Sequence, residues 1–240
     1  MIKHHPLNKR PTKIHRALLS VYDKSHAVEL AKTLVKNNIE ILSTGGTALF
    51  LREAGIHVID VSDYTNFPEI MDGRIKTINP LIEGGILGLR NQHEKEALAN
   101  NIKWIDLVVC NLYPFSATIT EEDCSLQKAL ENVDIGGPTM IRSAAKNLGW
   151  VTVIIDPNDY LPIANELKKN GNISYETRKK LSSKAFGHTA HYDTIVYNYL
   201  NEDTLPPQIS LTFEKHSEMR YGENPHQRAS SYSIPGRKEP

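Results

Sequence analysis

The sequence predicts an α/β protein built on a mainly parallel sheet with helices on both faces. Short apolar runs of strand type alternate with segments whose apolar residues recur at helical spacing, and this order is typical of parallel sheets. The apolar share, 40% of 240 residues, is enough to fill such a core. Because no apolar run approaches the ~18 residues of a membrane span, we expect no membrane-spanning segment.

The alternation begins at Arg16, where a basic leading segment stops. Apolar runs mark the strands, and the glycine at position 55 ends the second helix. In order, we expect a strand over 16–23, a helix over 25–38, a strand over 40–43, a helix over about 47–54 and a strand over 57–62.

The second half of the alternation follows a segment rich in glycine and proline. Residues 68–88 are too interrupted for one regular element, so we expect an ordered loop at a site, carrying Arg74 and Lys76. Beyond it we expect helices near 92–100, 125–132 and 138–147, strands over 106–112 and 150–156, a continuous helix over 175–200 and a strand-like run at 211–213.

Composition divides the chain into three parts. Residues 1–15 form a basic tail that we expect to be frayed or loosely docked, and they lack the apolar stretch of a secretory signal. Residues 16–200 carry the alternating elements and are expected to form one domain. Residues 201–240 are too polar to form a core of their own, so we interpret them as a linker and the beginning of another domain.

The charge balance and the cysteine count exclude several classes of function. Lys and Arg together number 28, as do Asp and Glu, and this zero balance argues against a broadly basic nucleic-acid-binding surface. Cys110 and Cys124 are too few for a disulfide framework or a cysteine metal site. We expect reduced thiols, in keeping with a cytoplasmic protein.

A hydroxyl-rich glycine turn, STGGT at 43–47, follows the second predicted strand. Its glycines let the backbone turn tightly, and the free amides of the next helix point at a bound anion. Ser20 and Lys24 follow the first strand closely, and the carboxyl ends of parallel strands share one edge. A phosphate is the expected ligand, with a capped helix and a solvated lysine as the alternative. The residues of this group are Ser20, Lys24, Ser43, Thr44, Gly45, Gly46 and Thr47.

Polar groups in three later segments are candidates for chemistry. In the interrupted loop, Arg74 suits bidentate contact with phosphate and Lys76 can polarise an oxygen. Tyr113 ends the strongest predicted strand and can donate to a developing oxyanion. Asp134 precedes a helix that carries Lys146. Structural roles stay open for all of them: a solubilising loop, an aromatic plug, a helix cap and a charged outer face.

The one histidine pair with metal-ligand spacing is His188 and His191. The apolar spacing of the surrounding helix puts His188 on the core face, and no carboxylate or cysteine lies at a suggestive distance along the chain. We therefore assign no metal.

Six segments in this order resemble the bifunctional purine-biosynthesis family with AICAR transformylase and IMP cyclohydrolase activities. They are SVYDKSHAVELAKTL, ILSTGGTALFL, FPEIMDGRIKT, DLVVCNLYPF, NVDIGGPTMIRSAAKN and KAFGHTAHYD, and the similarity spans about residues 16–200. The chain is similar to the N-terminal cyclohydrolase half. The resemblance implies a methylglyoxal-synthase-like fold.

The resemblance also implies a reaction: closure of formylated aminoimidazole carboxamide ribotide (formyl-AICAR ribotide) to inosine monophosphate (IMP) with loss of water. The site must hold the amide nitrogen against the formyl carbon, restrain the ribose 5′-phosphate and stabilise an oxyanion. This chemistry needs no cofactor. The implied partners are the small-molecule ribonucleotide and a second copy of the chain as a homodimer, with no nucleic acid and no membrane.

Site residues are carried over by their place in these motifs. The hydroxyl, glycine and lysine residues of the predicted anion site match phosphate-binding positions, and Arg74 and Thr77 match ligand-contact positions. The catalytic positions are matched by Lys76, Tyr113, Asp134 and Lys146. We expect Lys76 and Tyr113 to stabilise the formyl oxygen, and the other two to orient the carboxamide and move its proton.

The chain departs from the family pattern in two places. Asn79 and Glu83 stand where the family has histidines in KTLHPKIHGG, which puts the function of that loop in question. Residues 220–227, RYGENPHQ, resemble the opening of the transformylase half, whose catalytic Lys-His pair is missing from this chain. We expect no transformylase activity and therefore no use of 10-formyltetrahydrofolate.

Three other interpretations stay open. A methylglyoxal synthase would share the fold type and the phosphate site, but it would not need the NLYPF, DIGGP and SAAKN segments. A regulatory nucleotide-binding module would need the anion site without the four catalytic positions. An inactive fragment of the same fold would still fold through residues 16–200.

Overall fold

The computed structural model describes residues 5–234 and divides into two compact units. The first, which we call the sheet unit, comprises the described residues up to Tyr113 together with Asp134–Thr189. The second comprises Pro114–Val133 and the described residues from Ala190 onward. The three-part domain division drawn from the sequence stays a prediction, and residues 1–4 and 235–240 of its two end segments lie outside the described part.

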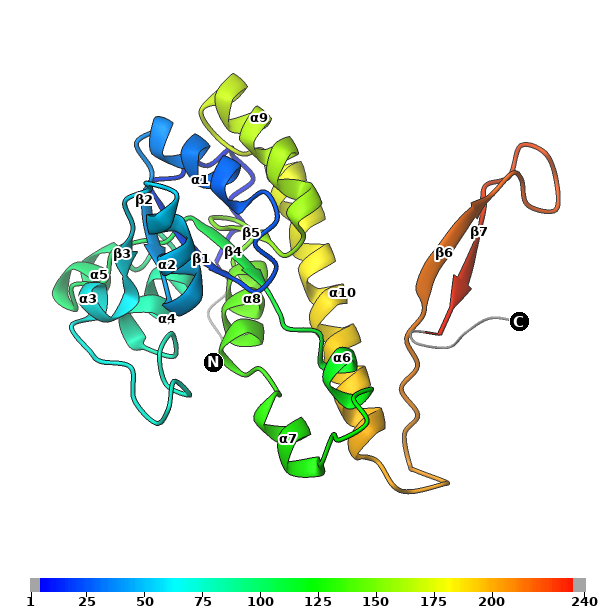
Figure 1. Cartoon of the computed structure of the whole chain (residues 1–240). Coiled ribbons are helices and arrows are strands. Elements are labelled where there is room, and N and C mark those ends of the chain that lie inside the picture. The colour runs from blue at the N-terminus through cyan, green and yellow to red at the C-terminus, as the bar shows by residue number, and fades with distance from the viewer. Residues whose placement is uncertain (1–4, 235–240) are drawn as a thin grey trace. The chain divides into compact units, whose positions relative to one another are not determined.

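The sheet unit is built on one five-stranded sheet in the order β3-β2-β1-β4-β5 (Figure 1). Every pair of neighbouring strands is parallel. The strands are β1 (Arg16–Val21), β2 (Glu40–Ser43), β3 (Ile59–Asp60), β4 (Leu107–Asn111) and β5 (Thr152–Ile154). The predicted parallel sheet is therefore confirmed, and the carboxyl ends of its strands share one edge.

Helices cover both faces of this sheet, as the sequence predicts. Figure 1 shows α1 (Ala27–Lys36) and α9 (Tyr160–Asn170) on one side and α4 (Pro80–Leu87) and α8 (Gly136–Lys146) on the other. Alternate strand residues divide between the faces, so that Leu19 and Val109 join the core with α1 and α9. The remaining helices of this unit are α2 (Gly45–Glu53), α3 (Val61–Thr65), α5 (Glu94–Ala99), the short 3₁₀ helix η1 (Pro157–Asp159) and the first part of α10 (Tyr175–Leu200).

The strand expected over 57–62 is wrong in its extent. Only Ile59 and Asp60 pair with β2, opposite Leu42 and Ser43, and α3 begins at Val61. The reason is the length of the neighbour: β2 ends at Ser43, so later residues of an edge strand have no ladder to join.

The loop expected over 68–88 is also corrected, because eight of its residues, Pro80–Leu87, form α4. The side-chain oxygen of Asn79 accepts a hydrogen bond from the Leu81 amide at 2.8 Å, and Pro80 occupies the first turn. Gly85 serves close packing, since a Cβ there would lie 2.6 Å from the carbonyl oxygen of Lys103. Tertiary packing thus overrides the low helix propensity of the glycines.

Two helices begin earlier than the sequence suggested. The expected starts were residue 47 and residue 138, whereas α2 begins at Gly45 and α8 at Gly136. Each helix therefore contains a Gly-Gly pair in its first turn. Sequence patterning missed η1 and α9 altogether.

The second unit contains α6 (Phe115–Ile119), α7 (Leu126–Glu131), the last part of α10 and a hairpin of β6 (Glu214–Met219) and β7 (Ala229–Ser233). The strand expected at 211–213 is wrong, because that segment runs along α10 instead. There, Thr212 contacts Nδ1 of His191 at 2.7 Å, and the Asn198 amide donates to the Ser210 carbonyl at 3.2 Å.

The leading segment is docked on the sheet unit along its described part. Thr12 and Ile173 exchange two backbone hydrogen bonds of 3.0 and 2.9 Å. The buried Arg178 guanidinium donates to the Arg10 carbonyl at 2.9 Å. The tail therefore becomes part of the packed unit from about residue 8 onward, rather than fraying.

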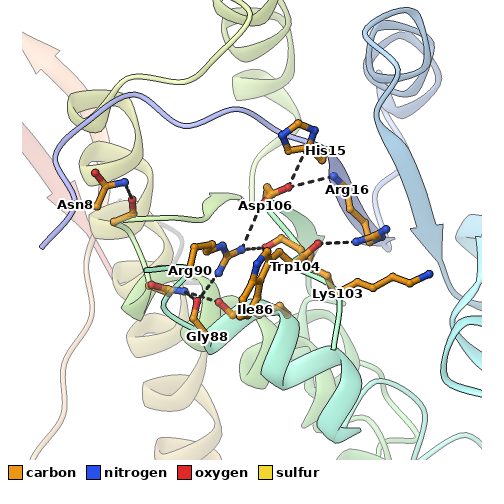
Figure 2. A network of polar contacts seen from close by, with 12 residues as sticks. Asn8, His15, Arg16, Ile86, Gly88, Arg90, Lys103, Trp104 and Asp106 are labelled. Atoms are coloured by element: carbon orange, nitrogen blue, oxygen red, sulfur yellow. Dashed lines mark hydrogen bonds and ion pairs between the residues drawn. The ribbon is translucent and has the colours of Figure 1, made fainter. Parts of the chain in front are cut away.

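A buried polar network ties together the amino ends of the strands (Figure 2). Arg90 donates to the carbonyls of Gly88 and Ile105 at 2.6 and 2.7 Å and pairs with Asp106 at 3.3 Å. The other carboxylate oxygen of Asp106 accepts from the His15 amide at 2.9 Å. Burial lowers the pKa of Arg90, and Asp106 opposes that shift. These contacts fix the start of β1 against the start of β4.

Candidate active site

Hydroxyl groups gather where β1 and β2 end. Ser20 Oγ lies 3.3 Å from Thr44 Oγ1 at the carboxyl edge of the sheet. Ser43 is fully buried and donates to the Leu19 carbonyl at 2.8 Å. Thr47 Oγ1 accepts from the Val21 amide and donates to the Val21 carbonyl, both at 3.0 Å. Ser43 therefore joins β2 to β1 and Thr47 joins α2 to β1, whereas Ser20 and Thr44 remain at the edge.

The N-terminus of α2 is open at this edge. Gly45 has a φ of +44°, a conformation that favours glycine, and nothing lies within 4 Å of where a Cβ of Gly46 would be. The first amides of a helix lack intrahelical partners and carry a partial positive charge. The sequence-predicted turn therefore offers the geometry that an anion needs.

Lys24 reaches the same edge from the loop after β1. Its ammonium lies 3.5 Å from the Tyr22 carbonyl oxygen. The loop itself is held by Asn111 at the end of β4, whose Oδ1 accepts from the amides of Tyr22 and Asp23 at 2.7 and 2.9 Å. The Asn111 amide also donates to the Asp23 carbonyl at 3.0 Å. One side chain thus fixes the backbone just before Lys24.

Asn111 is a residue that sequence reasoning did not assign. It stands in the same NLYPF segment as Tyr113, where only the aromatic ring was singled out. Its place at the end of the interior strand β4 was the available signal, because that is where a parallel sheet presents polar groups.

Lys76 and Thr77, consecutive in the chain, lie against the first residues of two different helices. The Lys76 ammonium is 3.4 Å from the position that a Cβ of Gly45 would occupy, at the start of α2. The Thr77 hydroxyl is 3.1 Å from the corresponding position on Gly136, at the start of α8. Both glycines leave space that a side chain would fill. The loop therefore places a cation, Lys76, at the N-terminus of α2 and a hydroxyl, Thr77, at the N-terminus of α8. Both helix ends carry a partial positive charge.

Arg74 lies further out in the same loop and is exposed. It follows a turn in which Met71, Asp72 and Gly73 all have positive φ. Next to Lys76, a hollow of about 50 Å³ opens to solvent. It is lined by Thr44, Gly45, Asp60, Val61, Ser62, Phe67, Glu69 and Lys76.

Tyr113 is half-buried just beyond the end of β4. Its ring packs edge-on against Tyr22, with the ring centres 4.7 Å apart. Because Asn111 fixes the Tyr22 backbone, the loop that carries Lys24 and the ring of Tyr113 are positioned together. This contact places an aromatic pair beside the predicted anion site.

Asp134 caps the start of α8. One carboxylate oxygen accepts from the Gly137 amide at 2.9 Å, and a Cβ on Gly137 would come within 2.5 Å of the other. The pKa of the Cys110 thiol is raised by burial and further by this carboxylate. Asp134 therefore has the capping role left open by the sequence, at a position next to the end of β4.

The comparisons with known proteins agree with this architecture. Residues 26–139 match the model of the MGS-like domain, and residues 144–239 match the model of the AICARFT/IMPCHase bienzyme. The bifunctional purine biosynthesis protein PurH of Acetivibrio thermocellus is 51% identical over 229 residues, which cover 93% of this chain and 45% of that protein. PurH of Bacillus cereus is 51% identical over 225 residues, covering 92% and 44%. A crystal structure of ForH, at 33% identity and a TM-score of 0.70, covers 78% of this chain and is itself covered fully.

The chain belongs to the AICARFT/IMPCHase bienzyme family. The resemblance drawn from the six motifs is confirmed, and so is the methylglyoxal-synthase-like fold. The chain spans less than half the length of the PurH relatives that it matches. The assignment of individual site residues stays a prediction within this family.

One of the catalytic positions carried over from the family lies apart from the others. Lys146 is exposed in the last turn of α8, whereas Asp134 precedes the first turn. Ten residues at 1.5 Å each separate Gly136 from Lys146, which is roughly 15 Å along a rigid helix. Within one copy of this AICARFT/IMPCHase family chain, the structure does not bring Lys146 to the carboxyl edge.

The two departures from the family pattern have structural roles. Asn79 caps α4, as described above. Glu83, on the same helix, accepts from the Ser143 hydroxyl of α8 at 2.6 Å. Burial raises the pKa of Glu83, and the Ser143 hydrogen bond lowers it by less. Asn79 therefore acts at the start of α4, and Glu83 acts on the contact between α4 and α8.

The described part of the chain has neither a metal-binding cluster nor a membrane-spanning helix. Residues 5–234 contain no group of three or more His, Cys, Asp or Glu side chains arranged to hold a metal ion. None of the helices described is both long and apolar enough to cross a membrane. His191 of the HxxH pair instead contacts Thr212 and, at 3.3 Å, Glu214.

Proposed function

We propose that this chain is an IMP cyclohydrolase, which closes formyl-AICAR ribotide to IMP with loss of water. The observation that carries the proposal is the placement of Lys76 and Thr77 against the Gly-Gly starts of α2 and α8. A substrate with a phosphate at one end and a developing oxyanion at the other needs two such sites close together. Membership of the bienzyme family supports the same reaction.

The ribose 5′-phosphate would bind at the start of α2. Ser20 and Thr44 present hydroxyls there, the first amides of the helix point outward, and Lys24 supplies a positive charge. Charge-assisted hydrogen bonds of this kind both bind and orient the substrate. Ser43 and Thr47, which the sequence grouped with them, would act by holding β2 and α2, respectively, against β1.

Ring closure would take place between the phosphate site and α8. The carboxamide nitrogen attacks the formyl carbon, a C–N bond forms, and negative charge develops on the formyl oxygen. Lys76 and Tyr113 would stabilise that oxygen, which takes up two protons and leaves as water, while the formamido nitrogen loses its proton and forms a C=N bond to the same carbon. Asp134 would orient the carboxamide and accept the proton that the carboxamide nitrogen loses. Lys146 can take part in the same step only if a second copy of the chain brings it to this edge.

The proposal also covers the cofactor, the oligomeric state and the cellular compartment of the enzyme. No cofactor is required, because the formyl group is already attached to the substrate. We propose a homodimer in the cytoplasm, in keeping with the two free cysteines, of which Cys110 is buried. The partner molecule is the small ribonucleotide, with no nucleic acid and no membrane.

A spectrophotometric assay tests this proposal directly. The purified chain is mixed with formyl-AICAR ribotide, without metal or folate, and IMP formation is followed. We expect turnover that is lost in Lys76→Ala and retained in Lys95→Ala, which removes an exposed lysine on α5. Binding of IMP without turnover would contradict the proposal and favour a regulatory nucleotide-binding module.

A further inference from the structure

The loop that carries Lys76 is closed by a short backbone bridge. Ile70 and Ile75 exchange two hydrogen bonds, of 3.2 and 3.3 Å. The residues that flank such a bridge face each other across the loop. These are Glu69 and Lys76, and the Glu69 carboxylate lies 2.7 Å from the Lys76 ammonium. The ion pair is therefore built into the mouth of the loop.

The turn at the end of the loop leaves room for this carboxylate. Met71, Asp72 and Gly73 have φ values of 55°, 55° and 87°, so the chain reverses through consecutive left-handed residues. At Gly73 a Cβ would lie 2.6 Å from Glu69 Oε1, a distance that side chains do not tolerate. One oxygen of Glu69 thus lies against the bare Cα of Gly73 while the other contacts Lys76.

The ion pair between Glu69 and Lys76 affects the position of the lysine more than the stability of the fold. The Lys76 ammonium lies at the start of α2, where the helix dipole is also positive, so the two repel each other when no anion is bound. Glu69 supplies the opposite charge. Its side chain is 46% exposed and that of Lys76 is 27% exposed, so the pair adds little to the free energy of unfolding. What it fixes is the direction of the lysine side chain.

We propose that Glu69 is a positioning residue, whose carboxylate holds the Lys76 ammonium over Gly45 so that the cation is in place before substrate binds. The inference rests on the proposed function and adds to it a residue that none of the site motifs assigned. Glu69 does not touch substrate in this scheme. It acts through Lys76, and it also lines the hollow next to that lysine.

The main test compares kcat and KM in three variants. Glu69→Gln keeps the shape and removes the charge, and we expect kcat to fall about tenfold while KM changes by less than about threefold. Glu69→Asp keeps the carboxylate and should recover most of that loss. Asp72→Asn removes a charge from the same loop without a contact to Lys76, and it should behave as the unmodified chain does. Full activity of Glu69→Gln, or an equal loss in Asp72→Asn, would overturn the proposal.

A second test asks whether Glu69 acts through Lys76. In a Lys76→Ala background, Glu69→Gln should cause no further loss of kcat, because the group that it positions is gone. An additional tenfold loss in that background would show that Glu69 has a separate role and would overturn the proposal.

A third test does not depend on turnover. The ¹⁵N–¹H signal of the Lys76 ammonium, assigned by its absence in Lys76→Ala, should be observed in the unmodified chain and in Asp72→Asn. In Glu69→Gln it should be lost through faster exchange with water. An unchanged signal in Glu69→Gln would overturn the positioning role even in a chain with no cyclohydrolase activity. Conversely, a lost signal in an inactive chain would reject the proposed function while the ion pair stands.

Discussion

The cationic side chains at the two ends of the parallel sheet differ in how many partners they have. At the amino ends, Arg90 and Arg16 each have a carboxylate and at least one backbone carbonyl as partners. At the carboxyl ends, and within the described part of the chain, Lys24 contacts a single carbonyl oxygen at 3.5 Å and Lys76 contacts one half-exposed carboxylate. A fully partnered cation stabilises a fold, whereas a sparsely partnered one can exchange its partner for a ligand.

The comparison also explains why both kinds of site occur on one sheet. Parallel strands start together and end together, and the helices that follow the strands begin at the carboxyl edge. Helix N-termini therefore add positive potential only there. The amino edge instead neutralises Arg90 and Arg16 with Asp106 and Glu40.

The largest expected effect comes from Lys76→Ala. If the carboxyl edge stabilises an oxyanion, kcat should fall about 10²–10³-fold, because one preorganised donor is lost. The melting temperature should stay within ~2 °C of the unmodified chain, since a half-exposed ion pair adds little stability. Steady-state turnover and thermal unfolding measure the two quantities. A loss of stability without a loss of kcat would reverse the roles assigned to the two edges.

Arg90→Ala tests the opposite edge. The variant leaves Asp106 buried beside two carbonyls that lose their donor, so the free energy of unfolding should fall by about 3 kcal/mol. Where the variant is still folded, kcat should be unchanged. Urea unfolding gives the first quantity, with Lys95→Ala as an exposed control that should lie within ~0.5 kcal/mol of the unmodified chain. A stable variant would show that the network in Figure 2 is dispensable.

Lys24→Ala tests whether Lys24, at the carboxyl edge, contributes to substrate binding or to the chemical step. Loss of a charge at the phosphate site should raise the dissociation constant for IMP about tenfold, with a smaller effect on kcat. Calorimetric titration with IMP measures this, and Lys32→Ala on the exposed face of α1 is the matched control. If Lys24→Ala lowered kcat at saturating substrate and left binding unchanged, Lys24 would belong to the chemistry instead.

Asn111→Ala should have a smaller effect of the same kind. Its three hydrogen bonds to Tyr22 and Asp23 order the loop before Lys24, so we expect IMP to bind about fivefold more weakly. In a Lys24→Ala background the same substitution should change the IMP affinity by less than ~twofold. Equal effects in both backgrounds would indicate that Asn111 contacts the ligand itself.

The smallest expected effect concerns Glu83 and pH. Burial raises the pKa of this carboxyl group above its ordinary value of 4.5, so folding favours the protonated form. The favourable contribution is present in full below the unfolded pKa and is lost as the pH rises through the folded pKa. Glu83→Gln should therefore be slightly more stable than the unmodified chain at pH 7, and the difference should shrink below pH ~4.5. Urea unfolding at the two pH values checks the sign.

The fold could be predicted from the sequence wherever local pattern and tertiary context agree. Strand β2 and helix α10 match their predicted ranges because each has an uninterrupted apolar pattern. Helix α4 could not be predicted, since its glycines are tolerated only by contact with residues near Lys103. The length of β3 could not be predicted either, because it depends on where the neighbouring strand β2 ends.

The site shows the same limit. The strand-end rule brought Ser20, Thr44 and Lys24 to one edge correctly. It could not show that Ser43 points into the sheet, because its direction depends on the strand register. The pairing of Glu69 with Lys76 could not be predicted from the sequence, since the two side chains meet only once the loop has closed. The position of Lys146 depends on the length of α8 rather than on its motif.

The burial of Cys110 has a practical consequence for experiments on this chain. Its side chain is 2% exposed and its thiol is held protonated, whereas Cys124 is partly exposed. A thiol-reactive dye added to the folded chain should therefore attach at Cys124, giving one chromophore per molecule without mutagenesis. Cys110 would react only when β4 is released from the sheet, so its slower labelling would record how often this strand opens.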